Sequence, residues 1–347
     1  MAYDTYLTII VPAAIAFAVT YFGTRFLVSY MVDSGVTSID HNKKSKPTLP
    51  SSGGVAVAFG FAVGILAYVF GDSFSIYNAV ASIASIFATV IAVLMISFVG
   101  FLDDINVQRE MTKSTGMMDY RKGLEQWQKP LLTIFGAIPL VAINAGVSII
   151  RVPFLGAVNL GIIYPILVIP LAVVFASNAF NLLGGFDGIA AGSGLIASLG
   201  LFIYSIAYGS YIGTLVSGML FAALLAFTIF TVYPAKILPG DSLSYAVGTI
   251  LVTAMILGNM EAFGIIVFMP WIIEFLLHAR KRFSSTDLGI LRKDNTFSSP
   301  YGKKIYSWTH LIMNLKRCRE WEVSLYMWFI ELGFVIMAFA MKYFALL

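Results

Sequence analysis

Apolar runs of roughly twenty residues recur along this chain, and most charged side chains lie in the segments between them. A run of this length matches the helix needed to cross the hydrocarbon core of a bilayer. Inside that layer, helices satisfy their own backbone hydrogen bonds. The content of 59% hydrophobic and 12% charged residues, with a mean hydropathy of +0.87, is typical of a membrane protein. We therefore expect an all-α, polytopic membrane protein in which residues 1–347 form a single domain.

The apolar runs predict about ten transmembrane helices. The division between the eighth and ninth depends on a short turn, from Gly258 to Glu261. The expected bounds are 6–31, 51–71, 78–101, 130–147, 162–182, 189–208, 211–231, 243–259, 261–279 and 323–345.

The distribution of Lys and Arg predicts the orientation of these helices. With ten spans, 20 of the 22 Lys and Arg residues fall on one side, and only Arg151 and Lys342 fall on the other. Because cytoplasmic loops carry the excess of Lys and Arg, we expect the basic side to be cytoplasmic and both termini to lie outside. The same bias accounts for the net charge of +4, so nucleic acid is not an expected partner. The expected cytoplasmic loops are 33–50, 102–129, 183–188, 232–242 and 280–322.

A polar motif at residues 177–188, Ser-Asn-Ala-Phe-Asn-Leu-Leu-Gly-Gly-Phe-Asp-Gly, follows one apolar run directly. Asn178 and Asn181 are three residues apart and share a helix face. The glycines that follow free the backbone to leave the helix, which brings the carboxylate of Asp187 back beside the amides. Oxygen-rich side chains at a membrane boundary suit a hard cation and a phosphate-bearing ligand. A glycine-capped helix followed by an ordinary polar loop is the alternative.

Further charged residues occur on the same expected side. Asp103 and Asp104 end an apolar run, and neighbouring helix positions point in different directions, so one carboxylate is expected to face a site and the other to orient it or contact a cation. Lys129 begins a helix, where an anion would offset its conflict with the helix dipole; simple anchoring at the membrane edge is the alternative. Asp241 follows a Pro-Gly turn and is a candidate helix cap or magnesium ligand.

The last basic loop begins with Arg280, Lys281 and Arg282. Arginine side chains are well suited to binding a diphosphate, although three cations at a helix end also serve as a membrane anchor. His278 and His310 have no companions at metal-ligand spacing, so a zinc site is not expected.

Five segments, taken in this order, resemble the polyprenyl-phosphate N-acetylhexosamine-1-phosphate transferases, and most closely their archaeal and eukaryotic dolichyl-phosphate branch. The histidine cluster of the bacterial muramoyl-pentapeptide branch is absent from the last loop, which argues against the cell-wall precursor as donor. The Arg-His-Arg cluster of the eukaryotic enzymes is represented only by residues 280–282. The five segments are residues 42–50 with 53–54, residues 100–104, residues 178–188, residues 233–234 with 240–241, and residues 268–270.

The resemblance implies transfer of N-acetylglucosamine-1-phosphate from UDP-N-acetylglucosamine to a polyprenyl (dolichyl) phosphate, with release of UMP. This is the first step of lipid-linked oligosaccharide synthesis for N-glycosylation, at the cytoplasmic face of the cell membrane. It further implies Mg²⁺, or Mn²⁺ in its place, and a possible homodimer. The implied site residues are Asp103 and Asp104 at the reaction centre, Asn181 and Asp241 as metal ligands, and Asn106, Lys129, Asn178, Asp187, Arg280 and Arg282 in substrate binding.

Several readings stay open at the level of sequence. One of the two adjacent aspartates orients the acceptor or takes a residual proton, and a covalent aspartyl intermediate is the less favoured route. The donor is open to another UDP-N-acetylhexosamine, and the acceptor to undecaprenyl phosphate for a cell-envelope polysaccharide. A transporter or lipid flippase would use the same polar residues, but such proteins place intramembrane charges near the midplane. A membrane scaffold would need no magnesium.

Overall fold

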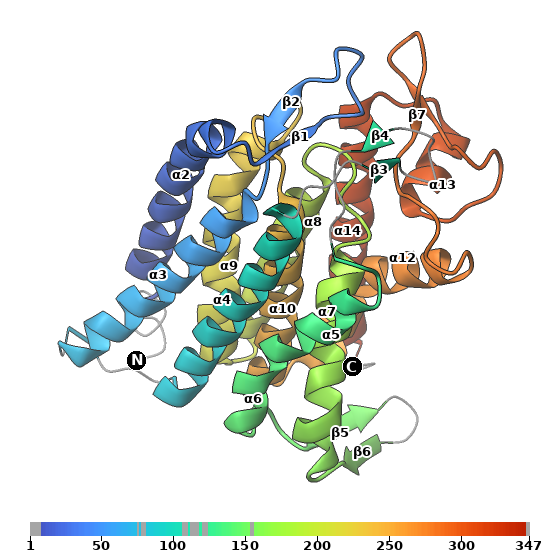
Figure 1. Ribbon diagram of the computed structural model, residues 1–347. Helices are drawn as coiled ribbons and strands as arrows, with labels where there is room; N and C mark the ends of the chain where they lie inside the picture. The colour runs from blue at the N-terminus through green and yellow to red at the C-terminus, as the bar shows by residue number, and fades with distance from the viewer. Residues whose placement is uncertain are drawn as a thin grey trace.

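The computed structural model describes residues 8–74, 76–77, 81–105, 110–111, 118–119, 124–152 and 156–344. The described part is a bundle of helices that run between two ends of the molecule (Figure 1). Its strands form two-stranded antiparallel ribbons at those ends, outside the bundle.

Among the described residues, seven helices are long and apolar enough to cross a membrane, or eight if a bent helix pair is counted as one span. The prediction of a helical, polytopic membrane protein is thereby confirmed. The total of ten would also require the two shorter apolar segments, Gln128–Ala142 and Tyr164–Phe180, so that number stays a prediction. The long helices are α2 (Ile10–Asp33), α3 (Gly54–Ser73), α4 (Ile83–Ile105), α8 (Ile189–Ala207), α9 (Tyr211–Thr231), α10 (Gly240–Gly258) and α14 (Glu320–Tyr343).

The other apolar segments are interrupted, and prolines lie at the interruptions. The expected span 261–279 consists of α11 (Glu261–Val267) and α12 (Met269–Ala279), which are bent by 59° just before Pro270. Proline supplies no backbone N–H, so it interrupts the hydrogen-bond ladder of the preceding turn. Pro139 stands in the first short segment, which consists of α5 (Gln128–Thr133), the 3₁₀-helix η1 (Ile134–Ala137) and α6 (Ile138–Ala142). Pro165 stands in the second, which consists of the π-helix η2 (Tyr164–Val168) and α7 (Ile169–Phe180).

Helix α10 forms the centre of the bundle. Of the residues in its most apolar stretch, 83% are buried, against 22% of those in the corresponding stretch of α2 at the periphery. Glycines let two neighbouring helices approach its first turn. A Cβ atom at Gly54 would lie 1.9 Å from the backbone nitrogen of Leu243, and one at Gly100 would lie 2.6 Å from the carbonyl oxygen of Asp241. The beginning of α3 and the end of α4 are therefore held against the start of α10.

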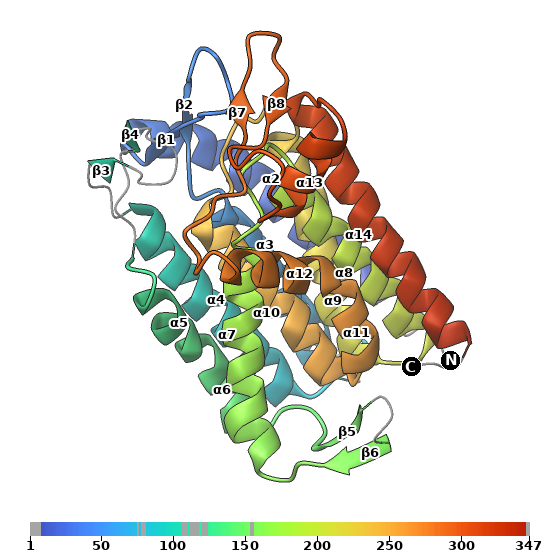
Figure 2. The same cartoon turned by 90° about the vertical axis from the view of Figure 1, so that its right-hand side faces the viewer.

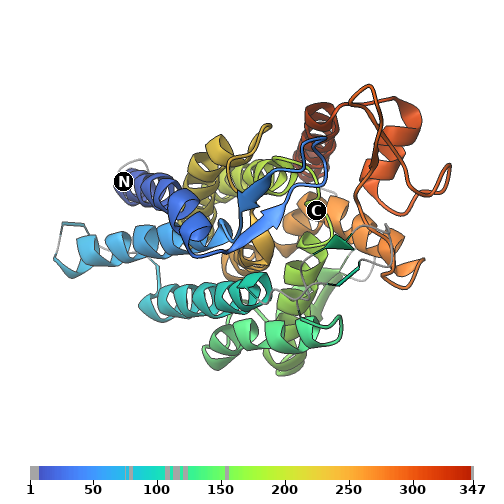
Figure 3. The same cartoon turned by 45° about the horizontal axis from the view of Figure 1, so that its top comes forward.

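The loops cluster at one end of the bundle. That end carries three of the ribbons and helix α13, whereas the fourth ribbon, the start of α2 and the end of α14 lie at the opposite end (Figures 1 and 2). The first ribbon crosses the helix ends (Figure 3), where Pro50 accepts a hydrogen bond from the backbone of Leu238 (2.8 Å). Which end faces the cytoplasm stays a prediction. The ribbons are β1 (Thr37–Ile39) with β2 (Thr48–Pro50), β3 (Glu110–Met111) with β4 (Met118–Asp119), β7 (Ile290–Leu291) with β8 (Phe297–Ser298) and, opposite, β5 (Ile149–Val152) with β6 (Gly156–Asn159); α13 is Trp308–Leu315.

Candidate functional site

The two adjacent carboxylates at the end of α4 have different partners. The Oδ2 atom of Asp103 lies 2.6 Å from Nζ of Lys129, and Oδ1 accepts a hydrogen bond from the backbone of Leu124. Asp104 instead accepts hydrogen bonds from the backbone N–H groups of Asp241 (2.8 Å) and Ser242 (3.2 Å). Both aspartates are buried. Asp103 therefore faces a cation, whereas Asp104 holds the first turn of α10, where backbone N–H groups lack partners within the helix.

Lys129 joins α4 to α10. Its Nζ atom lies between two carboxylates, 2.6 Å from Oδ2 of Asp103 and 3.0 Å from Oδ2 of Asp241. The turn before Asp241 requires glycine: Gly240 has a φ of +72°, and a Cβ atom there would lie 2.2 Å from Oδ2 of Asp104. The helix ends thus bring together three charged residues that are far apart in the sequence.

A cavity of about 310 Å³ lies beside this cluster, within the size of small-molecule sites. Asn181, at the end of α7, and Asp241, in the first turn of α10, both line it, so the two expected metal ligands share one cavity. Asp187 lines it as well. The side chain of Asp241 keeps 26% of its surface exposed, so a ligand in the cavity can reach it.

The donor groups fit a hard divalent cation. The amide of Asn181 and the carboxylate of Asp241 offer oxygen atoms, the type of ligand that Mg²⁺ takes in proteins, with remaining positions left to phosphate and water. Lys129 supplies one positive charge between the carboxylates of Asp103 and Asp241. An additional cation would offset the excess of negative charge.

A second lysine is held among carboxylates on another side of the cavity. Nζ of Lys43 lies 3.0 Å from Asp40, 2.7 Å from Asp187 and 2.6 Å from Glu320, and all three acids are buried. Burial alone would lower the pKa of Lys43, but its hydrogen bonds to Asp187 and Glu320 and their charges raise that pKa above its ordinary value. Lys43 therefore stays charged and ties the loop before α3 to the loop before α8 and to the start of α14.

Sequence reasoning overlooked most of this second cluster, which we call the Lys43 cluster (Asp40, Lys43, Asp187 and Glu320). Only Asp187 was identified as a site residue. Lys43 lies in one of the segments that carry the family resemblance, and Asp40 precedes it by three residues, so a weak local signal was present. Glu320 lies 277 residues from Lys43, and no local pattern links the two.

The other residues expected to bind substrate lie outside the cavity lining, or outside the described residues. The amide nitrogen of Asn178 donates to Thr133 (2.9 Å), which joins α7 to α5. Arg280 and Arg282 are exposed, and Arg280 contacts the loop that follows it, through the carbonyl of Ile305 (3.4 Å). Asn106 lies outside the described residues. Substrate contacts by these four residues stay predictions.

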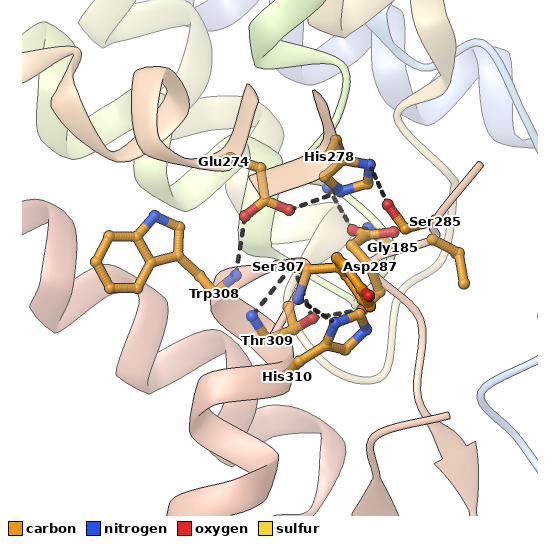
Figure 4. A network of polar contacts seen from close by, with 12 residues as sticks. Gly185, Glu274, His278, Ser285, Asp287, Ser307, Trp308, Thr309 and His310 are labelled. Atoms are coloured by element: carbon orange, nitrogen blue, oxygen red, sulfur yellow. Dashed lines mark hydrogen bonds and ion pairs between the residues drawn. The ribbon is translucent and has the colours of Figure 1, made fainter. Parts of the chain in front are cut away.

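The long loop between α12 and α13 also reaches the cavity, which sequence reasoning did not anticipate. Asp287 lines the cavity together with Gly184 and Gly185. Figure 4 shows Asp287 beside Gly185, in a polar network that also contains His278 and Glu274. Asp287 is one of two aspartates in this basic loop, and no local signal distinguishes it from a solvated side chain such as Asp294.

Comparison with known proteins supports the resemblance. The profile of Glycosyl transferase family 4 matches residues 86–259, half of the chain. Two archaeal proteins, from Sulfolobus acidocaldarius and Saccharolobus solfataricus, are each 32% identical to this chain; both are provisionally named UDP-N-acetylglucosamine–dolichyl-phosphate N-acetylglucosaminephosphotransferase. The alignments cover 96% of this chain in both cases, with 95% and 96% of the respective relatives.

A bacterial relative from Shouchella clausii, named phospho-N-acetylmuramoyl-pentapeptide-transferase, is 30% identical, with 86% of this chain and 84% of the relative covered. The region that the profile matches contains Asp103, Lys129, Asn181 and Asp241, the residues gathered around the cavity and the adjoining helix ends. The profile matches half of the chain, and the two archaeal relatives align with nearly all of it. The chain therefore belongs to glycosyl transferase family 4.

Proposed function

We propose that this protein transfers N-acetylglucosamine-1-phosphate from UDP-N-acetylglucosamine to dolichyl phosphate, or a closely similar polyprenyl phosphate, and releases UMP. The observation that carries the proposal is the position of Lys129 between Asp103 and Asp241, where Asp241 also lines the cavity. The names of the two archaeal relatives, which align over nearly the whole chain, supply the donor and the acceptor.

The reaction exchanges one phosphorus–oxygen bond for another. An oxygen of the lipid phosphate bonds to the sugar-bearing phosphorus, the bond from that phosphorus to the bridging oxygen breaks, and UMP leaves with the electron pair. A phosphate monoester has a second pKa of about 6, so the acceptor is largely a dianion at pH 7. The main obstacle is therefore the approach of two anions rather than deprotonation, and fixed positive charge at the reacting phosphates lowers it.

We assign Lys129 to the phosphates of the donor and Asp103 to the orientation of Lys129. We also assign to Asp103 the acceptance of a residual proton from the acceptor. Asp104 has a positioning role, because both of its oxygens accept hydrogen bonds from the first turn of α10. That turn carries Asp241, so Asp104 holds the expected metal ligand in place.

Asn181 and Asp241 would hold Mg²⁺. The ion, when bound, supplies charge neutralisation to the phosphate of the leaving UMP. Asp187 lines the same cavity, in which we place the donor. Its bonds to Lys43 (2.7 Å) and to the backbone of Ala235 (2.9 Å) fix its carboxylate at the edge of that cavity.

We further propose that the cavity opens at the cytoplasmic face and that the product enters lipid-linked oligosaccharide synthesis for N-glycosylation. The expected cytoplasmic loops supply most of the cavity lining, and the positive-inside bias of the sequence supports this orientation.

Identification of the lipid product tests the function. Purified protein in detergent is incubated with Mg²⁺, dolichyl phosphate and, in separate reactions, UDP-N-acetylglucosamine, UDP-N-acetylgalactosamine or the UDP-muramoyl-pentapeptide, and the lipid fraction is analysed by mass spectrometry. We expect a dolichyl diphosphate N-acetylglucosamine from the first donor. A product from another donor alone would retain the chemistry and change the substrate. Failure with all three donors, and with undecaprenyl phosphate as acceptor, would contradict the proposal.

A further inference from the structure

The loop between α12 and α13 reaches the cavity that Asn181 and Asp241 line, and it does so through Asp287. Its Oδ2 atom accepts hydrogen bonds from two consecutive backbone N–H groups, those of Gly184 (3.0 Å) and Gly185 (2.7 Å). Consecutive N–H groups that converge on one atom form an anion-binding arrangement. The backbone of Asp287 is fixed as well, because its carbonyl accepts a hydrogen bond from the hydroxyl of Thr309 (2.5 Å).

The turn that receives this carboxylate lies between two predicted ligand-binding residues. Gly184 and Gly185 stand between Asn181, which ends α7, and Asp187, which precedes α8. Gly185 is held from both sides, since its carbonyl accepts a hydrogen bond from the amide of Asn42 (2.6 Å). A Cβ atom at Gly185 would lie 2.7 Å from Oδ1 of Asp287, so the close approach requires glycine.

The segment that carries Asp287 is anchored on both flanks (Figure 4). The hydroxyl of Ser285 lies 3.2 Å from Nδ1 of His278, and Nε2 of that histidine lies 3.1 Å from Oε1 of Glu274. The other oxygen of Glu274 accepts a hydrogen bond from the backbone of Trp308 (2.9 Å). Both Glu274 and His278 are buried. The loop is therefore tied to α12 before and after Asp287, so the carboxylate is presented from a fixed position.

We propose that Asp287 is a positioning residue for the nucleotide-sugar pocket, and that it holds the Gly184–Gly185 turn so that Asn181 and Asp187 both face the cavity. The identity of the donor in this inference rests on the proposed function. The carboxylate acts through the turn and not by contact with the donor phosphates, because a negative side chain would repel them. A hydrogen bond to a charged acceptor is stronger than one between neutral groups, which suits a turn that contains two flexible glycines.

Two variants and a matched control test this role. Asp287→Ala removes both hydrogen bonds, whereas Asp287→Asn keeps a neutral acceptor of the same shape. Asp294→Asn is the control, because Asp294 lies in the same loop, is exposed, and bonds only locally to Thr296 among the hydrogen bonds found for it (2.7 and 3.1 Å). Each protein is measured by hydrogen–deuterium exchange at the peptide containing residues 181–188, and by the KM values for UDP-N-acetylglucosamine and dolichyl phosphate.

For Asp287→Ala we expect faster exchange at residues 184–185 and a donor KM raised by about tenfold, the size expected for a lost charge-assisted hydrogen bond. The KM for dolichyl phosphate should change by less than about twofold, which separates positioning of the donor pocket from general damage. Asp287→Asn should give a smaller change of the same kind, and it carries the comparison if the alanine variant does not fold. Asp294→Asn should match the wild type.

Unchanged exchange in the folded Asp287 variants would overturn the inference, and so would equal increases in the two KM values. If the wild-type protein makes no product from UDP-N-acetylglucosamine, the proposed function fails separately. The exchange measurement then still decides the role of Asp287: faster exchange at 184–185 supports it, and unchanged exchange contradicts it.

Discussion

Two half-buried lysines lie among carboxylates at the loop-bearing end of this protein, and different kinds of structure bring their acidic partners to them. Lys129 contacts Asp103 and Asp241, which stand at helix ends packed closely against each other. Lys43 instead contacts Asp187 and Glu320, which belong to segments 144 and 277 residues away along the chain. The first cluster is therefore set by the packing of the helix bundle, whereas the second fastens loops around the cavity. We expect the Lys129 cluster to govern turnover and the Lys43 cluster to govern stability.

The largest expected effect is that of Lys129→Met on turnover. Loss of the only cation found between Asp103 and Asp241 in the described structure should lower kcat for UMP release by at least about 100-fold, the size seen when one fixed electrostatic group is removed from an active site. Lys236→Met is the control, since Lys236 is exposed at the same end of the bundle. A kcat within a few fold of the wild type would place the reaction elsewhere.

Lys43→Met should act mainly on stability. The change leaves three buried acids without their shared cation, and we expect a loss of about 3 kcal/mol, measured by thermal unfolding in detergent. Adding Glu320→Gln should restore part of the loss, because it removes one of the acids that repel each other. An additive double variant would show that Lys43 and Glu320 are not coupled.

The pH dependence of the Lys43 contribution follows from the sign of its pKa shift. The folded-state pKa is raised above the ordinary value of 10.5, so this stabilisation is fully present below pH 10.5 and is lost only as the pH rises through the folded-state value. The difference in stability between the wild type and Lys43→Met should therefore not decrease from pH 7 to 9. A difference that falls within this range would contradict a charged Lys43.

Asp104→Asn sharpens the distinction between the adjacent aspartates. The two carboxylate oxygens of Asp104 each accept one backbone hydrogen bond from the α10 turn, whereas an asparagine amide has only one oxygen that can accept. We therefore expect a loss of about 2 kcal/mol in stability. Asp103→Asn should instead act mainly on turnover, with a smaller loss of stability, because Lys129 keeps Asp241 as a partner. The reverse pattern would exchange the roles that we assign to the two residues.

Asn178→Ala should have the smallest effect. Its amide bridges α7 and α5 through Thr133, and loss of one neutral hydrogen bond typically costs about 1 kcal/mol. Thermal unfolding should report this loss, while the KM for the donor stays unchanged. A large increase in the donor KM with normal stability would instead support the substrate-binding role that the sequence predicts for Asn178.

The helical architecture was predictable from the sequence because a bilayer fixes the length of an apolar helix. Asp103 and Asn181 were recognisable because they are polar and stand where apolar runs end, and Asp241 because it follows a Pro-Gly turn at the start of a helix. The bend at Phe268 was missed, although Pro270 in the expected span 261–279 is a local signal for it. Asp287 and Glu320 were not identified, because their partners are distant in the sequence and only the folded chain brings them together.

The magnesium dependence of UMP release tests the central claim most directly. Purified wild-type protein and the Asp241→Asn variant are titrated with Mg²⁺ at fixed UDP-N-acetylglucosamine and dolichyl phosphate. We predict that release requires both the lipid and the metal, and that Asp241→Asn needs at least about tenfold more Mg²⁺ for half-maximal release, as expected when one charged ligand is lost. Release that persists without Mg²⁺, or identical titrations for the two proteins, would contradict the account.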